Sequence, residues 1–82
     1  MSNDLKYIDN LRIEKGDVVI FDHGPIFTIK KINREKDEID GVMEGTDIGG
    51  PTTFSAEGVQ EALVNNDAQI KGKDLDEAVK HY

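Results

Sequence analysis

The chain of 82 residues contains no cysteine and no tryptophan, and its aromatic residues are three Phe and two Tyr. Without cysteine, a disulfide scaffold, a thiolate zinc site and a cysteine nucleophile are all excluded. The Phe residues are expected in the core, so too few aromatic side chains remain for a cage around a quaternary ammonium group.

Basic residues and long apolar runs are also scarce. Ten Lys and Arg stand against 17 Asp and Glu, a net charge of −7, which argues against general binding to nucleic-acid phosphates. No apolar run approaches the ~20 residues that span a bilayer, and the first residues lack the basic and apolar regions of a signal peptide. We therefore expect one small cytoplasmic domain over residues 1–82, with no membrane partner and with homo-oligomerisation left open.

The apolar residues that are present gather in segments that predict strands. Residues 17–22 include four consecutive apolar residues, a pattern typical of a strand covered at least in part on both faces. A Gly-Pro turn separates this segment from a second predicted strand over residues 25–33. There a break in the alternation predicts a bulge at Lys30 and Lys31.

The chain then predicts a charged hairpin tip, a strand over residues 38–44, and a short strand over residues 52–54. Ser55 is a suitable N-cap for a helix over residues 56–64, which must be held by packing because it is short and contains glycine.

Two further elements are predicted near the C-terminus. Residues 68–71 indicate a closing strand, and Asp74 and Glu77 have the spacing of a capping box for a last helix over residues 75–81. Residues 1–13 fit either a helical turn or the start of a strand.

Several of these segments resemble small SH3-like barrels. The resemblance rests on Leu11–Val19, which contains a Lys-Gly-Asp step into the first long strand, on the bent second strand, and on Thr53-Phe54 leading into a short helix. It implies a mainly β domain, an SH3-like β-barrel of four or five strands. In size and acidity the chain is similar to small phage-type accessory proteins that bind and inhibit a host component.

Charge is distributed unevenly along the chain. Residues 37–70 contain eight acidic and no basic residues, so they carry −8, and the remainder carries +1 because the total is −7. The acidic half is either a solvated surface that keeps the protein soluble or a face that docks on a basic surface of a partner protein. The residues expected at such a face are Asp40, Glu44, Asp47, Ile48, Glu57 and Glu61, with Tyr82 as a further apolar contact.

A glycine-rich stretch from Gly45 to Ser55 supports a different function. Such a loop before a helix N-terminus can cradle an anion with backbone N–H groups. The alternative function is therefore an oligomeric protein that sequesters a nucleotide-like phosphorylated small molecule. Neither a P-loop nor a dinucleotide fingerprint is present, and a flexible hairpin loop is the favoured interpretation of the stretch itself. The residues of this alternative site are Lys30, Lys31, Thr46, Gly49, Gly50, Thr52, Thr53 and Ser55.

No pattern predicts catalysis. His23 lies in a turn, His81 lies near the C-terminus, and Ser55 has a capping role, so no Ser/His/Asp set is expected to converge. No segment fits a calcium loop. We expect a protein that is not an enzyme and that uses no cofactor or metal. A structural barrel inside a larger assembly is the third hypothesis.

Overall fold

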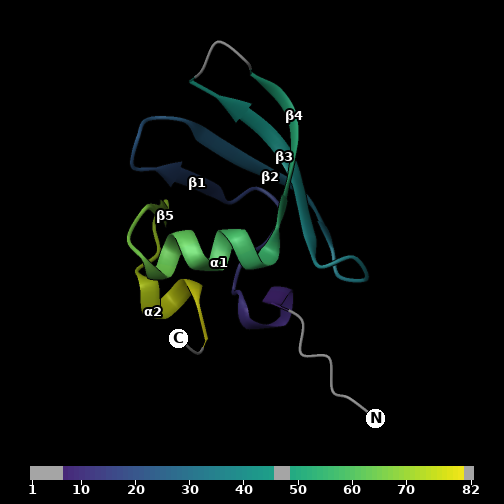
Figure 1. Ribbon diagram of the computed structural model, residues 1–82, viewed down its shortest axis with the longest axis vertical. Helices are drawn as coiled ribbons and strands as arrows, with labels where there is room; N and C mark the ends of the chain where they lie inside the picture. Colours follow the sequence, from purple (N-terminus) through teal and green to yellow (C-terminus); the bar gives the residue numbers. More distant parts are fainter. Residues whose placement is uncertain (1–6, 46–48, 81–82) are drawn as a thin grey trace.

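A computed structural model describes residues 7–45 and 49–80 as a curved antiparallel sheet with short helices on one side (Figure 1). The five strands lie in the order β4-β3-β2-β1-β5. The prediction of a mainly β domain with two short helices is confirmed. In chain order the elements are the 3₁₀ helix η1 (Tyr7–Asn10), β1 (Val18–Phe21), β2 (Ile26–Asn33), β3 (Glu38–Glu44), β4 (Gly50–Ser55), α1 (Ala56–Val64), β5 (Ala68–Ile70) and α2 (Leu75–Ala78).

Strands β1 to β4 form a meander, and β5 returns after α1 to pair with β1. The β2–β3 register shifts between Ile29 and Lys31, so the predicted bulge is confirmed, with Lys30 as the extra residue. A bulge increases the local twist of a strand pair, which contributes to the curvature of the sheet.

The two faces of the sheet have opposite environments. One face, here called the inner face, carries Val19, Phe27, Ile29 and Ile39, all of them buried. The helices pack on this face, and with them it forms the core. The other face, here called the outer face, carries the alternate residues of each strand. The outer face of β1 is covered only in part, as the expectation allowed, because Val18 is half-buried and Ile20 is 37% exposed.

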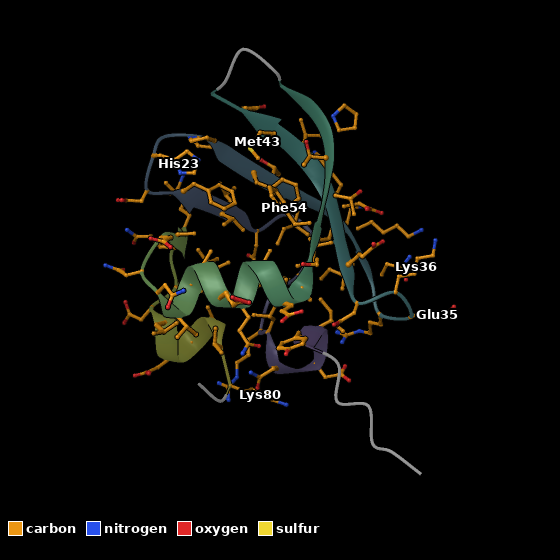
Figure 2. The ribbon with its side chains drawn as sticks, viewed as in Figure 1. His23, Glu35, Lys36, Met43, Phe54 and Lys80 are labelled. Atoms are coloured by element: carbon orange, nitrogen blue, oxygen red, sulfur yellow. The ribbon has the colours of Figure 1, made fainter. Side chains whose placement is uncertain are left out.

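Aromatic rings line the bend of the inner face. Phe54 in β4 makes an edge-to-face contact with Phe27, with ring centroids 4.8 Å apart, and lies 5.5 Å from Phe21. Figure 2 shows Phe54 and Met43 in this bend above α1, whereas Glu35 and Lys36 lie at the tip of the β2–β3 hairpin. Such ring pairs stabilise by about 1 kcal/mol beyond their buried area.

The sheet is not closed into a barrel, so the barrel prediction is wrong in this respect. The described edge strands β4 and β5 do not pair with each other. Ser55 ends β4 and caps α1 directly, and Val59 and Leu63 of α1 are buried against the inner face. The helix therefore fills the space in which β4 would otherwise approach β5, and β5 has only three residues.

Both helices begin where the sequence predicts. The Ser55 hydroxyl accepts a hydrogen bond from Gly58 N–H at 3.0 Å, and Asp74 and Glu77 form the predicted capping box. The predicted extension of α2 to residue 81 is wrong, because the helix ends at Ala78.

The chain leaves α2 because Val79 forms an isolated antiparallel bridge with Leu11. Val79 is fully buried, and its neighbours exchange backbone hydrogen bonds with Asn10 and Arg12. The open question on the N-terminal segment is answered for residues 7–13: a 3₁₀ helix is followed by this single bridge. Residues 1–6 and 81–82 lie outside the described residues.

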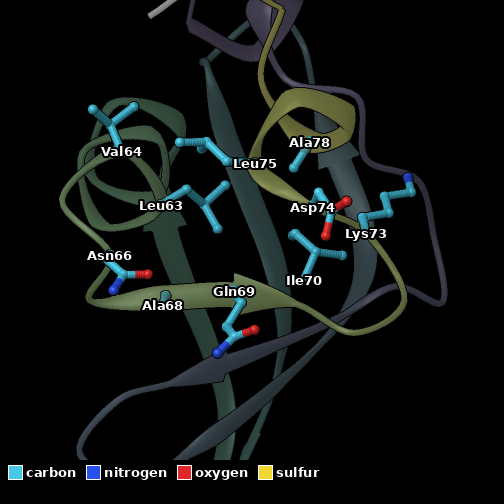
Figure 3. Close-up of a pocket in the computed structure, with 10 residues that line it drawn as sticks. All are labelled: Leu63, Val64, Asn66, Ala68, Gln69, Ile70, Lys73, Asp74, Leu75 and Ala78. Atoms are coloured by element: carbon cyan, nitrogen blue, oxygen red, sulfur yellow. The ribbon is translucent and has the colours of Figure 1, made fainter.

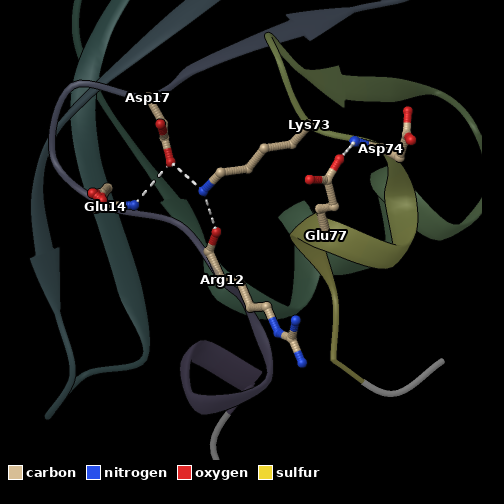
Figure 4. Close-up of polar contacts among 6 residues, drawn as sticks. All are labelled: Arg12, Glu14, Asp17, Lys73, Asp74 and Glu77. Atoms are coloured by element: carbon tan, nitrogen blue, oxygen red, sulfur yellow. Dashed lines mark hydrogen bonds and ion pairs between the residues drawn. The ribbon is translucent and has the colours of Figure 1, made fainter.

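Lys73 links the C-terminal turn to the segment before β1 (Figure 4). Its Nζ donates to the Arg12 carbonyl at 2.6 Å and lies 3.1 Å from Asp17 Oδ2. The same carboxylate oxygen accepts Glu14 N–H at 3.0 Å. The pair is largely shielded from solvent, so it stabilises more than a fully exposed ion pair.

Candidate functional site

The outer face of the sheet carries exposed apolar side chains. Ile20 and Ile26 lie directly opposite each other in the β1–β2 ladder, and each is 37% exposed. None of the described helices covers this face (Figure 1). The apolar surface, called here the outer patch, consists of Val18, Ile20, Ile26, Val42 and Pro51.

The outer patch extends across four strands, with the polar Thr28 between its Val18 and Val42. In the register, Val18 pairs with Thr28, Thr28 with Val42, and Val42 with Pro51. This row runs beside the Ile20–Ile26 pair, because side chains two residues apart on a strand share a face. Neighbouring strands are ~4.8 Å apart, so the row extends over roughly 14 Å.

Acidic residues border the outer patch on β3. Glu44 lies opposite Ile26, and Asp40 lies opposite Lys31 on one side and Thr53 on the other. The Thr53 hydroxyl donates to Asp40 Oδ1 at 2.7 Å, which fixes the direction of this carboxylate. Two of the predicted partner-binding residues, Asp40 and Glu44, therefore lie beside the apolar surface.

The other predicted acidic residues do not lie there. Glu57 and Glu61 are exposed on α1, on the side turned away from the sheet, because Ala56, Val59 and Leu63 form the buried side. They belong to a different surface from Asp40 and Glu44. Asp47, Ile48 and Tyr82 lie outside the described residues.

Asp37, which contributes to the acidic half of the sequence, has a structural role. Its carboxylate accepts the N–H groups of Tyr7 at 3.2 Å and Ile8 at 2.7 Å. It adopts a left-handed conformation with φ of 57° at the end of the hairpin turn. The carboxylate thus holds the start of η1 against the β2–β3 hairpin.

The residues of the alternative anion site are not brought together. The last six residues of the glycine-rich stretch form β4 (Gly50–Ser55) instead of a loop, so Gly49 lies a whole strand away from the N-terminus of α1. Lys31 is separated from β4 by the carboxylate of Asp40. Lys30, the bulge residue, is likewise on β2, two strands from β4.

The hydroxyl groups of this alternative site form hydrogen bonds elsewhere, and they do not all lie on the same face of the sheet. Thr52 donates to the Gly50 carbonyl at 3.2 Å, Thr53 donates to Asp40, and Ser55 caps α1. Thr52 is on the inner face and Thr53 on the outer face, since they are successive strand residues. Thr46 lies outside the described residues.

His23 is the one histidine among residues 7–45 and 49–80. His23 is exposed in the β1–β2 turn, where its ring centroid lies 5.9 Å from that of Phe21. Among residues 7–45 and 49–80, no three His, Asp or Glu side chains are grouped closely enough to hold a metal ion. Within the same residues, no helix has the length and apolar character needed to cross a membrane.

A notch of about 340 Å³ lies between α1, β5 and α2, and the sequence did not indicate it (Figure 3). Its apolar lining comes from Leu63, Val64, Ala68, Ile70, Leu75 and Ala78. Its charged residues already have partners, because Lys73 binds Asp17 and Asp74 caps α2. The notch is therefore a concave, mainly apolar surface with few free polar groups that could orient a ligand.

The outer patch is the feature that sequence reasoning missed. The signal in the sequence was the run of four apolar residues from Val18 to Phe21. Such a run is typical of a strand that is buried on both faces, so Val18 and Ile20 were not expected to form an exposed surface. Only the structure distinguishes a covered face from an open one. Comparison of the chain with protein-family models, with curated proteins and with solved structures finds no match.

Proposed function

We propose that the protein is a non-catalytic binding module whose outer face docks on a partner protein with basic and apolar groups. The observation that carries this proposal is the Ile20–Ile26 pair, exposed beside the β1–β2 turn on a sheet face that no described helix covers. Contiguous exposed apolar surface with a polar border is typical of interaction sites.

Charge defines the chemistry of the partner. Asp40 and Glu44 border the outer patch, and Lys31 is the basic residue opposite Asp40. An apolar centre with a charged rim is the usual anatomy of a protein interface. A basic rim on the partner would speed association and fix its orientation. An inhibitor or adaptor that covers a basic surface of its partner fits this arrangement.

We also propose that the sheet is an opened relative of the SH3-like barrel. What supports this is the chain path, in which a four-strand meander is followed by a short helix and a fifth strand that returns to β1. Since SH3-like folds serve many functions, the docking proposal rests on the outer patch and not on this likeness.

The docking proposal is tested with a photo-crosslinking amino acid placed at position 26, or at position 64 as the matched control. Val64 is 38% exposed, almost the same as Ile26, but it lies on α1. In lysate of the cells that produce the protein, we expect position 26 and not position 64 to crosslink one partner.

The purified partner is then titrated with two variants that each replace an exposed aliphatic residue by glutamate. We expect Ile26→Glu to weaken binding at least ~10-fold, because a charge would replace an apolar contact that the partner desolvates. Val64→Glu should bind as the wild type does. Equal binding by Ile26→Glu, with unchanged circular dichroism, would contradict the proposal.

A further inference from the structure

We propose that two copies of this chain join edge to edge through β4, with the two β4 strands antiparallel and centred on Thr53. The inference rests on the backbone groups of β4 and does not depend on the docking proposal. Among the described strands, β4 is an edge of the sheet and pairs with β3 alone.

The register identifies which groups of β4 are free. Ala56 N–H donates to the Asp37 carbonyl at 2.8 Å. In an antiparallel ladder the bonded pairs recur at every second residue. Residues 50, 52 and 54 therefore bond to β3, and residues 51, 53 and 55 direct their backbone groups to the open edge.

These three residues present two donors and two acceptors. The donors are the N–H groups of Thr53 and Ser55, and the acceptors are the carbonyls of Pro51 and Thr53. Pro51 has no N–H, and the Ser55 carbonyl accepts the first hydrogen bond inside α1 because Ser55 is its N-cap. Within the described part of the chain, no other group bonds to these donors and acceptors.

A two-fold axis at Thr53 brings each of these donors opposite an acceptor of the second copy. Thr53 N–H meets the carbonyl of the partner's Thr53, and the reverse bond forms equally. Ser55 N–H meets the carbonyl of the partner's Pro51, again in both directions. Pro51 has no N–H to donate, but the group opposite it is the carbonyl of the partner's Ser55. That carbonyl already accepts a hydrogen bond inside α1, so no bond of the pairing is lost.

The side chains of β4 also suit a second copy. Natural edge strands are often protected by charged residues or by proline. The six residues of β4 include no charged residue, although 33% of the chain is charged, and Pro51 removes no hydrogen bond from the pairing proposed here. On the inner face, half-buried Phe54 would lie beside Thr52 of the partner subunit. The two Asp40 carboxylates would be roughly 14 Å apart, beyond the ~8 Å screening length of physiological salt.

The two-fold axis would be perpendicular to the sheet. Both outer patches would therefore lie on the same side of one continuous sheet. If the docking proposal also holds, the dimer presents two docking surfaces to one partner or assembly, and linked sites of this kind bind more tightly than single ones.

Sedimentation equilibrium of the full chain tests the dimer. Over a concentration range up to about 1 mM, we expect the mass to rise from 9.1 kDa towards twice that value. We expect Thr53→Lys and Thr53→Glu each to be monomeric, because like charges would lie directly opposite across the axis. An equimolar mixture of the two variants should restore the dimer, and Thr53→Val should dimerise as the wild type does.

Circular dichroism and thermal melting establish that each variant is folded. Amide hydrogen exchange gives a second measurement, because Thr53 and Ser55 amides should be protected in the dimer and exposed in Thr53→Lys. A wild type that stays monomeric throughout overturns the inference. So do lysine and glutamate variants that both remain dimeric, or a mixture that stays monomeric. Loss of partner binding in Ile26→Glu alone concerns the docking proposal and not this one.

Discussion

Gly41 in β3 lies on the inner face where the ring of Phe27 passes over the backbone. A Cβ added at Gly41 would lie 2.7 Å from Phe27 Cζ and would also meet the Thr28 carbonyl. Phe27 is fully buried and contacts Phe54 edge to face. The absence of a side chain at Gly41 is therefore what allows the aromatic cluster to form.

We expect Gly41→Ala to lower the free energy of unfolding by about 2 kcal/mol or more, because the ring or the strand must shift in a packed core. Gly58→Ala is the control, since its Cβ would meet only the Ser55 hydroxyl, at 3.1 Å, on the exposed side of α1. Urea titration followed by circular dichroism measures both. Equal, small effects would show that the inner face can relax around position 41.

Residue types alone did not reveal which residues are structural and which are exposed. Asp37 reads as part of an acidic surface, but it binds the N–H groups of Tyr7 and Ile8 across 30 and 29 positions of sequence. Ile20 reads as core but is exposed. Both roles depend on which segments meet in space, and local patterns carry no information about that.

The secondary-structure elements were predictable because their signals are local. The strand bounds of β3, the bulge in β2 and the start of α1 agree with alternation, its interruption and the N-cap at Ser55. Barrel closure was not predictable, because it depends on where α1 lies between β4 and β5. The early end of α2 has the same origin, since Val79 pairs with a residue 68 positions away, Leu11.

The cap of α1 gives a prediction at this scale. We expect Ser55→Ala to cost about 1 kcal/mol of stability, because Gly58 N–H would lose its acceptor. Ser55→Thr retains a hydroxyl and should cost much less. Chemical denaturation of the two variants distinguishes them, and equal stability of Ser55→Ala and wild type would mean that packing alone holds α1.

At the scale of the whole molecule, the charge of −7 is divided between separate surfaces. Asp40 and Glu44 border the outer patch, whereas Glu57 and Glu61 lie on the far side of α1. The sequence could show that residues 37–70 are acidic, but not that the strand and helix carboxylates point in different directions. Only a comparison of the two surfaces separates local docking from a general effect of net charge.

Two double variants make this comparison at equal net charge. Asp40→Lys with Glu44→Lys, and Glu57→Lys with Glu61→Lys, each add four charges and change −7 to −3. Against the partner identified through position 26, we expect the strand pair to slow association at least ~10-fold and to remove most of its salt dependence. The helix pair should keep the salt dependence and change the rate only slightly. Association rates measured from low to high salt decide between them: equal effects would mean that net charge, and not the surface around Ile20 and Ile26, governs binding.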